Sequence, residues 1–319
     1  MILLTGGAGF IGSCLLNKLN NEGIEDILLV DNLSNSSKWK NLIGKKYTAY
    51  ENKDIFIDKL QFGEFDNKIE YIFHLGACSS TTETDIDYLM YNNFNFSKEI
   101  AEFALSNNIG MMYASSAATY GNGEFGYSDT NFDNLRPLNG YGYSKHIFDQ
   151  WVISQGYESR LTGFKYFNVF GPNEYHKDAM SSMVFKSFNQ IKEMSKVNLF
   201  KSNDSQYVDG GQKRDFIYVK DVVDVMWKSY QNSIYGIYNL GTGKARDWNS
   251  LVKAVFNALD KEVKIEYIDM PDNLKRQYQN FTEADMTKLN KNIKHNFMLL
   301  EDSINDYVKN YLSNSQPYF

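Results

Sequence analysis

The sequence has 319 residues, of which 43% are hydrophobic and 23% charged, and this is ordinary for a globular chain that buries a substantial core. A net charge of −6 with no long basic run argues against binding to a nucleic-acid backbone. No uninterrupted apolar run approaches membrane-spanning length, and Met1 leads directly into a strand pattern, so we expect neither a membrane segment nor a signal peptide.

The beginning of the chain has the pattern of a dinucleotide-binding βαβ unit. The apolar run Ile2–Leu4 precedes Thr5-Gly6-Gly7-Ala8-Gly9-Phe10-Ile11-Gly12, and leucines with helical spacing follow. Glycines permit a tight turn and a close backbone approach, so a pyrophosphate can lie at the N-terminus of the helix. The second strand, 27–30, ends in Asp31, where a carboxylate would meet an adenosine ribose hydroxyl. Together these features predict binding of a nicotinamide dinucleotide.

The choice between NAD and NADP stays open at this point. Asp31 favours NAD, because a carboxylate repels a 2′-phosphate. Lys38 and Lys53 would instead neutralise that phosphate, and Asn32 would hydrogen-bond it. Surface lysines are common, so these residues alone do not decide between the two cofactors.

The segment 69–74 predicts a further buried strand that opens into the small residues 75–80. Small residues at the carboxyl end of a strand let the backbone approach a ligand, here the diphosphate and ribose of the cofactor. We interpret His74 as a packed strand residue. Cys78, without a partner histidine or metal-ligand spacing, is interpreted as a small lining residue. With Cys14 it is one of two cysteines, which suits a reducing cytoplasm.

The next helix and strand add polar groups to the same edge of the sheet. The helix from about Asp85 to Asn107 carries Asn92, which either faces the cofactor or caps a polar side. The strand 111–116 ends in hydroxyl groups, where open α/β sheets place their ligands. Ser116 is positioned to hydrogen-bond a substrate alcohol; alternatively, it is only a turn-forming serine.

Tyr141 and Lys145 lie four residues apart, and on a helix that spacing places them on one face. A cation beside the phenol would lower the pKa of the tyrosine from its solution value of about 10. Such a tyrosine can take a proton from an alcohol as hydride leaves the same carbon for a nicotinamide. The alternative is an amphipathic helix that carries both residues by chance.

The remaining chain predicts one more strand of the main sheet, 161–167, and then a weaker alternation from about residue 172. We expect helices over 180–194 and 221–231, strands at 199–200, 213–219, 237–240 and 265–268, and a polar loop over 201–213. The sequence therefore predicts an α/β fold, a doubly wound parallel sheet of Rossmann type with a smaller mixed α/β substrate lobe. The predicted domains are 1–171, with returning segments at about 214–243, and mainly 172–319.

These motifs resemble the extended short-chain dehydrogenase/reductases, whose cofactor loop matches residues 5–12 and whose catalytic trio matches Ser116, Tyr141 and Lys145. Further stretches are similar to the group within that family that epimerises ADP-heptoses at C6″ for lipopolysaccharide core biosynthesis. These stretches are His74–Glu83, Ala114–Gly121, His176-Lys177, Lys213–Val219 and Arg276–Gln279. The similarity runs from Met1 to about Leu289.

The resemblance implies a redox-neutral epimerase that works with NADP, acts on an ADP-heptose nucleotide sugar and forms a homo-oligomer, by resemblance a pentamer. It implies Tyr141 as one catalytic base, Lys177 as a second, and Ser116 and Lys145 beside them. The implied cofactor residues are Gly6, Gly9, Phe10, Ile11, Gly12, Asp31, Asn32, Lys38, Lys53, Leu75, Gly76, Ala77, Cys78, Ser79, Asn92, Lys145, Val169 and Lys177. The implied substrate residues are Ser79, Ser116, Asn168, His176, Phe200, Lys201, Ser202, Asn203, Arg214 and Tyr278, and no metal is implied.

The sequence departs from the family pattern in two places. Leu75 stands where relatives often carry a polar residue, and the loop between Phe200 and Arg214 is longer than usual. A nucleotide-sugar 4,6-dehydratase is disfavoured, because Ala117 and Ala118 occupy the positions of its acid pair. A hexose-nucleotide 4-epimerase and a non-catalytic dinucleotide sensor remain as alternatives, although a sensor has no need of the intact trio.

Overall fold

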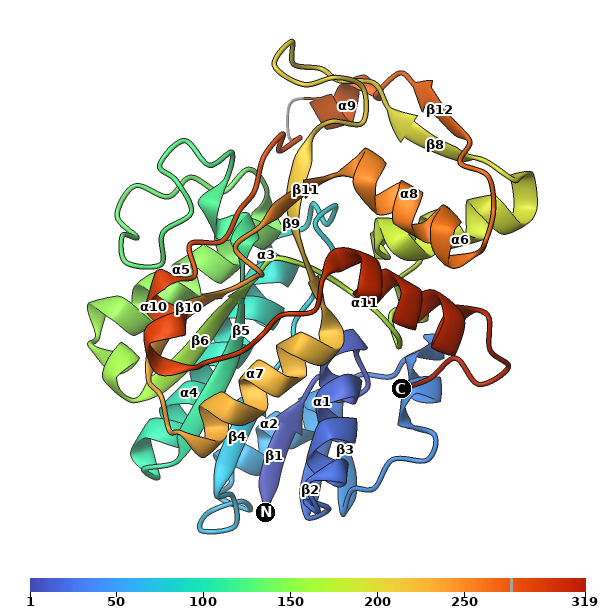
Figure 1. Cartoon of the computed structure of the whole chain (residues 1–319). Helices are drawn as coiled ribbons and strands as arrows, with labels where there is room; N and C mark the ends of the chain where they lie inside the picture. Colours follow the sequence, from blue (N-terminus) through green and yellow to red (C-terminus); the bar gives the residue numbers. More distant parts are fainter. Residues whose placement is uncertain (276–277) are drawn as a thin grey trace.

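The computed structural model describes residues 1–275 and 278–319 (Figure 1). Arg276 and Gln277, from one of the stretches that carry the resemblance, lie outside the described residues. In the described chain a parallel sheet has the strand order β10-β6-β5-β4-β1-β2-β3. Its strands are β1 Ile2–Thr5, β2 Ile27–Asp31, β3 Ala49–Asn52, β4 Tyr71–His74, β5 Gly110–Ser116, β6 Leu161–Tyr166 and β10 Gly236–Leu240.

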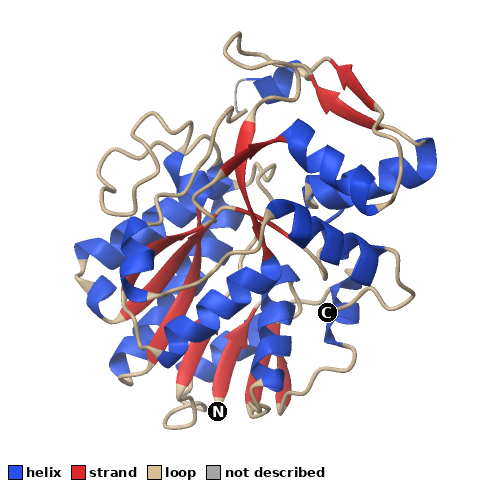
Figure 2. Cartoon of the chain, viewed as in Figure 1, coloured by secondary structure: helices blue, strands red, loops and turns tan. Residues whose placement is uncertain are grey.

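Helices cover both faces of this sheet (Figure 2), and the alternation of side chains along the strands explains why. Ile2 and Leu4 of β1 join the hydrophobic cluster under α1 (Phe10–Asn21) and α7 (Val219–Gln231). Leu3, between them, joins the cluster on the opposite face. The helices on that face are α2 Lys53–Gln61, α4 Phe96–Ser106 and α5 Gly140–Ser154. The predicted doubly wound α/β class is therefore confirmed.

Two small sheets extend from the carboxyl edge of the main sheet (Figure 1). One contains β11 Ala245–Asp247, β9 Lys213–Tyr218 and β7 Asn168–Phe170; the other pairs β12 Ile265–Ile268 with β8 Val197–Phe200. The helices of this part are α6 Met183–Met194, α8 Trp248–Ala258, α9 Asp272–Lys275, α10 Thr287–Asn292 and α11 Leu300–Tyr307. The domain boundary at residue 171 stays a prediction.

Most predicted elements agree with the structure to within a few residues. The long helix expected over 85–107 consists of α3 (Ile86–Leu89), a π-helical stretch (Met90–Asn95) and α4 in direct succession. The elements that were not predicted individually are β3, α2, β7, β11 and the helices α8 to α11. Within the described residues, none of the helices is both long enough and apolar enough to span a bilayer.

Candidate active site

The glycine-rich turn between β1 and α1 borders a cavity of about 590 Å³, within the usual size range of ligand pockets. Gly6 has a φ of +69°, and a Cβ atom there would lie 2.6 Å from the backbone nitrogen of Gly76. The turn therefore requires glycine at this position. Gly9 is the N-cap residue of α1 and has no side chain to cap the first amides of the helix. The first backbone amides of α1 and the glycine residues that line the cavity fit a pyrophosphate.

The carboxylate of Asp31, at the end of β2, is already engaged within the protein. It accepts hydrogen bonds from two backbone amides at 2.7 and 2.8 Å and pairs with Lys38 Nζ at 2.6 Å. A smaller cavity adjoins the 590 Å³ cavity and is lined by Lys53 together with Asp31, Asn32 and Lys38. The ammonium of Lys53 pairs with Asp54 at 2.8 Å. Lys38 thus opposes the negative charge that would repel a 2′-phosphate.

The predicted cofactor residues are brought together around these two adjoining cavities. The larger cavity is lined by Gly6, Gly9, Phe10, Ile11, Gly12, Asp31, Asn32, Lys38, Leu75, Gly76, Ala77, Ser79, Lys145, Val169 and Lys177. The smaller is lined in addition by Lys53, Cys78 and Asn92. Asn92 also donates to Tyr88 O at 2.8 Å, so it both faces the cavity and bonds within its own helix.

His74 lies behind this wall and is a packed strand residue, as interpreted from the sequence. Its ring is 2% exposed and is hydrogen-bonded to Thr5 Oγ1 at 2.7 Å and Ser97 Oγ at 2.8 Å. Burial, helped by the charge of Lys145, lowers the pKa of His74 to about 3. The imidazole is therefore neutral at physiological pH.

Tyr141 enters the larger cavity because α5 starts close to the end of β5. Asn139 caps the helix by accepting from Gly142 N at 2.8 Å. A Cβ atom at Gly142 would lie 2.7 Å from Ala118 O, so glycine is what lets the helix approach this closely. Ser116 and Tyr141 consequently line one cavity wall.

The expectation that Lys145 lowers the pKa of Tyr141 is wrong for this structure. Burial raises the pKa of Tyr141, and a hydrogen bond with Ser116 opposes this only in part. Lys145 Nζ instead donates to Ala114 O at 2.8 Å, and burial lowers the pKa of Lys145 to about 8. The one-turn spacing does place both groups on the cavity, but desolvation is the largest cause of the pKa shift at each of them, and Lys145 is not among the causes acting on Tyr141.

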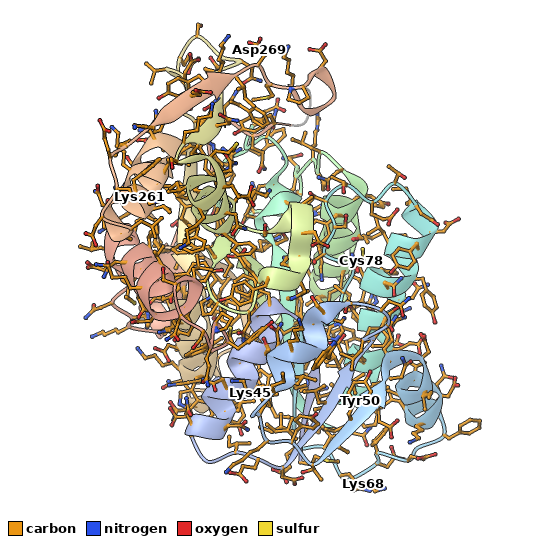
Figure 3. All side chains as sticks on the ribbon, turned by 90° about the vertical axis from the view of Figure 1, so that its right-hand side faces the viewer. Lys45, Tyr50, Lys68, Cys78, Lys261 and Asp269 are labelled. Atoms are coloured by element: carbon orange, nitrogen blue, oxygen red, sulfur yellow. The ribbon has the colours of Figure 1, made fainter. Side chains whose placement is uncertain are left out.

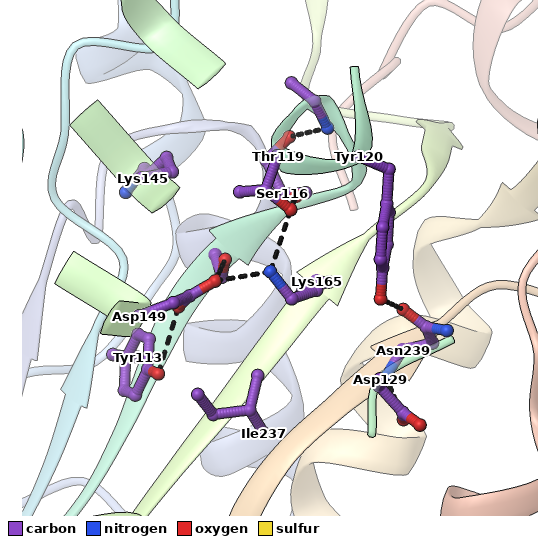
Figure 4. A network of polar contacts seen from close by, with 12 residues as sticks. Tyr113, Ser116, Thr119, Tyr120, Asp129, Lys145, Asp149, Lys165, Ile237 and Asn239 are labelled. Carbon is purple, nitrogen blue, oxygen red and sulfur yellow. Dashed lines mark hydrogen bonds and ion pairs between the residues drawn. The ribbon is translucent and has the colours of Figure 1, made fainter. Parts of the chain in front are cut away.

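A buried polar network supports this site from behind (Figure 4). Asp149, one turn beyond Lys145 on α5, pairs with Lys165 Nζ of β6 at 2.5 Å, and neither side chain is exposed. Asp149 also accepts from Ser115 Oγ at 2.6 Å, and Lys165 donates to Thr119 Oγ1 at 2.8 Å. The network joins β5, β6 and α5. Sequence reasoning missed it, although the spacing of four residues from Lys145 to Asp149 was visible.

Lys177 and His176 reach the cavity from a short 3₁₀ segment, Tyr175–Met180. Lys177 Nζ lies 5.8 Å from the ring centre of Phe10. Burial lowers the pKa of Lys177, with the charge of Glu174 opposing the shift, and burial lowers the pKa of His176 to about 4. A lowered pKa makes the neutral amine of Lys177 more accessible, which its action as an acid or base requires.

Another cavity, of about 540 Å³, adjoins the 590 Å³ cavity on the side of the two small sheets. The 590 Å³ cavity is termed the first cavity and the 540 Å³ cavity the second cavity. The two share Phe10, Asn168, Val169, Lys177 and Met180, so they meet at Lys177. Of the predicted substrate residues, Phe200 and Tyr278 line the second cavity, while Ser79, Ser116 and His176 line the first. Sequence reasoning missed several of its other lining residues, among them Glu174, Lys186 and Trp248. No local motif marks them, because the cavity forms only when distant segments pack.

Arg214 lies directly behind the aromatic wall of the second cavity. Its guanidinium carbon is 5.1 Å from the ring centre of Tyr278 and 5.7 Å from that of Trp248, and both rings line the cavity. Arg214 itself is 5% exposed and is not among the described residues that line the cavity. Its predicted contact with a diphosphate therefore stays a prediction.

Lys201, Ser202 and Asn203 do not join the lining of the cavities. Lys201 Nζ pairs with Asp269 at 3.0 Å, and Figure 3 shows Asp269 at the end of the molecule opposite Lys68. Ser202 bonds within its own loop, where its hydroxyl donates to Asp204 O at 2.7 Å. These residues follow Phe200, where the chain leaves β8 and turns away from the cavity.

Comparisons with known proteins agree with this geometry. The model of the NAD dependent epimerase/dehydratase family matches residues 2–241. The chain is 49% identical to an ADP-L-glycero-D-manno-heptose-6-epimerase of Nitratidesulfovibrio vulgaris (strain Hildenborough) and 47% identical to one of Fusobacterium nucleatum, covering all of both chains in each case. The crystal structure of the Helicobacter pylori ADP-L-glycero-D-manno-heptose-6-epimerase superposes with a TM-score of 0.83 at 31% identity, over 97% of this chain and 95% of the other. The chain thus belongs to the NAD dependent epimerase/dehydratase family.

Proposed function

We propose that the protein converts ADP-D-glycero-D-manno-heptose to ADP-L-glycero-D-manno-heptose by epimerisation at C6″. The observation that carries this proposal is the meeting of two cavities at Lys177, with Tyr141 in the wall of the first. Full-length relatives with the name of this activity support the choice of substrate. The role in lipopolysaccharide core biosynthesis and the homo-oligomer are proposed with it.

Two residues, Tyr141 and Lys177, act as proton-transfer groups in this reaction. Tyr141, which lines the same cavity as Ser116, takes the proton of the C6″ hydroxyl from one side. Lys177 is the corresponding group for the opposite face of the sugar. Lys145 lines the same cavity as Tyr141 and holds the end of β5 through Ala114 O. The chemistry that a nicotinamide would supply here, when bound, is reversible hydride transfer at C6″.

NADP is the cofactor that we propose. Lys38 pairs with Asp31 at 2.6 Å, and Lys53 lines the same small cavity, so the three lining side chains together carry one positive charge. Asp54, which pairs with Lys53 at 2.8 Å, does not line this cavity and is 62% exposed. A 2′-phosphate would meet attraction there, whereas the ribose hydroxyl of NAD gains nothing from the second lysine. The glycine turn and the open N-terminus of α1 suit the pyrophosphate of either cofactor.

The decisive experiment incubates the protein with ADP-D-glycero-D-manno-heptose in heavy water and resolves the C6″ epimers. We expect an equilibrium mixture that carries no deuterium at C6″, because the transferred hydrogen does not exchange with solvent. A carbanion route would introduce solvent deuterium at that carbon, and its stoichiometric incorporation would contradict the mechanism. Absence of the L-glycero epimer would contradict the substrate assignment. A hexose-nucleotide substrate epimerised at C4 would then favour the alternative.

A further inference from the structure

The chain between Gly171 and Ser182 is held at both ends by one buried carboxylate. Glu174 is 1% exposed and accepts from Gly171 N at 3.3 Å at one end of the segment. At the other end it accepts from Ser182 N at 2.5 Å and Ser182 Oγ at 2.7 Å. Tyr307 of α11 donates a fourth hydrogen bond at 3.1 Å. Burial raises the pKa of the Glu174 carboxyl, and the hydrogen bonds from Ser182, Gly171 and Tyr307 oppose this shift. All four partners are donors, which is the arrangement that favours the ionised form.

The segment that Glu174 closes carries Lys177 and has little regular structure of its own. Lys177 N donates to Glu174 O at 2.9 Å within a single 3₁₀ turn. The next residue, Asp178, has a φ of +44°, a left-handed conformation that non-glycine residues adopt at a cost of about 1 kcal/mol or more. The position of the Lys177 side chain therefore depends on tertiary contacts of the segment. These are the bonds of Glu174 at its ends, and the bonds from Tyr175 Oη to Pro317 O at 2.6 Å and from Lys186 Nζ to Ala179 O at 2.7 Å.

Glu174 also acts on Lys177 through its charge. Both residues line the second cavity, and the carboxylate opposes the burial that lowers the pKa of Lys177. The other charged or titratable groups are Tyr175, His176 and Asp178 on the segment itself, and around it Lys186 on α6, the pair of Lys38 with Asp31, and Tyr307 on α11. Among these neighbours, Glu174 is the anion that acts on both Lys177 and Lys186.

We propose that Glu174 is a positioning residue for the reaction, which fixes the segment that carries Lys177 and supplies the counter-charge that sets the protonation state of Lys177. This inference rests on the proposed role of Lys177. A purely structural role for Glu174 would affect stability and leave the titration of Lys177 unchanged. The titration of Lys177 is therefore the measurement that separates the two roles.

The first test measures Lys177 directly, without substrate. The full-length protein is pulse-labelled with acetic anhydride over a range of pH, and labelling of Lys177 is quantified by peptide mass spectrometry. Removing a nearby anion destabilises an ammonium group, so the midpoint for Lys177 moves to lower pH in Glu174→Gln. Asp221→Asn is the matched control, because Asp221 is also buried but holds His295 at 2.7 Å on another part of the fold. An unchanged midpoint in Glu174→Gln, or an equal shift in Asp221→Asn, would overturn the proposal.

The second test follows epimerisation. Glu174→Gln should lower kcat about ten-fold or more while KM changes less than about three-fold, because a misplaced acid or base affects the chemical step. In a Lys177→Met background the same substitution should have little further effect on kcat, since its target is absent. A full additional loss in that background would contradict the coupling. If the wild type does not epimerise the ADP-heptose, the proposed function fails, while the labelling result still decides on Glu174.

A second variant separates the two contributions and covers the case in which Glu174→Gln does not fold. Glu174→Asp keeps the charge but is one methylene too short to reach both ends of the segment. We expect a lower kcat with the labelling midpoint of Lys177 close to that of the wild type. A wild-type kcat in Glu174→Asp would show that the ties to Gly171 and Ser182 do not position Lys177.

Discussion

Replacing Lys165 by Met tests whether the buried ion pair behind Tyr141 holds the fold together. Lys165 and Asp149 are both 0% exposed and lie 2.5 Å apart. Methionine retains most of the stem of the lysine but leaves the Asp149 carboxylate without its cation. Hydrogen bonds from Ser115 and Tyr113 remain, at 2.6 and 3.1 Å. Loss of one partner of a buried pair typically costs about 3–5 kcal/mol, because an uncompensated charge stays buried.

This cost converts into a measurable shift of the melting temperature. An unfolding entropy of about 2.1 cal/mol/K per residue gives about 0.7 kcal/mol/K for 319 residues. A destabilisation of about 3–5 kcal/mol therefore lowers the melting midpoint by about 4–7 °C. Thermal unfolding followed by circular dichroism at constant pH measures this shift.

Two further variants serve as controls, one for the buried charge and one for the loss of an exposed ion pair. Asp149→Asn combined with Lys165→Met removes both charges and should restore half or more of the loss. Lys46→Met removes an exposed ion pair, with side chains 65% and 51% exposed, and should change the midpoint by less than about 1.5 °C. A Lys165→Met midpoint within 1 °C of the wild type, or a double variant less stable than Lys165→Met, would refute the argument.

Three other predictions concern the cavity. Tyr141→Phe should abolish epimerisation while the cofactor stays bound, because only the proton acceptor is lost; activity within a few-fold of the wild type would contradict its role. Replacing Lys38 and Lys53 together by Ala should weaken NADP more than NAD, and isothermal titration would show equal losses if the lysines add only general attraction. The folded-state pKa of His74 is depressed to about 3 from a usual value near 6.5, so its contribution to stability is present above pH 6.5 and is lost as the pH falls toward 3. His74→Asn should therefore show a shallower fall of the melting temperature between pH 7 and 4.5, and an identical slope would argue against the burial of a neutral imidazole.

The elements that sequence reasoning identified best are those whose pattern is determined locally. β1 and β2 are buried on both faces, so each reads as an unbroken apolar run, and the glycine turn between them has a recognisable spacing. β3 was missed because it pairs only with β2, at the edge of the sheet, and its residues are half-buried or exposed. An edge strand needs no continuous apolar pattern.

The residues of the candidate site also differ in how far local sequence alone identifies them. The spacing of Tyr141 and Lys145 is a property of one helix, so the sequence indicates it before any tertiary structure is known. The environment of Lys177 is different, because Phe10 of α1, Glu174 and the small lobe must pack before the ammonium is buried. Without the family resemblance, Lys177 reads as a solvated loop residue.

The failure of the pKa prediction for Tyr141 shows what the surrounding network contributes. Helical spacing places an ammonium near the phenol, but burial that suits a dry reaction site also disfavours both charged forms. Asp149, the next residue on the same helical face, raises the pKa of Lys145 against this burial. Asp149 in turn needs Lys165 to remain buried as an anion, since both side chains are inaccessible to solvent. The charge beside Tyr141 is therefore maintained by a chain of buried partners that reaches from α5 into β6, and not by the Tyr–Lys spacing alone.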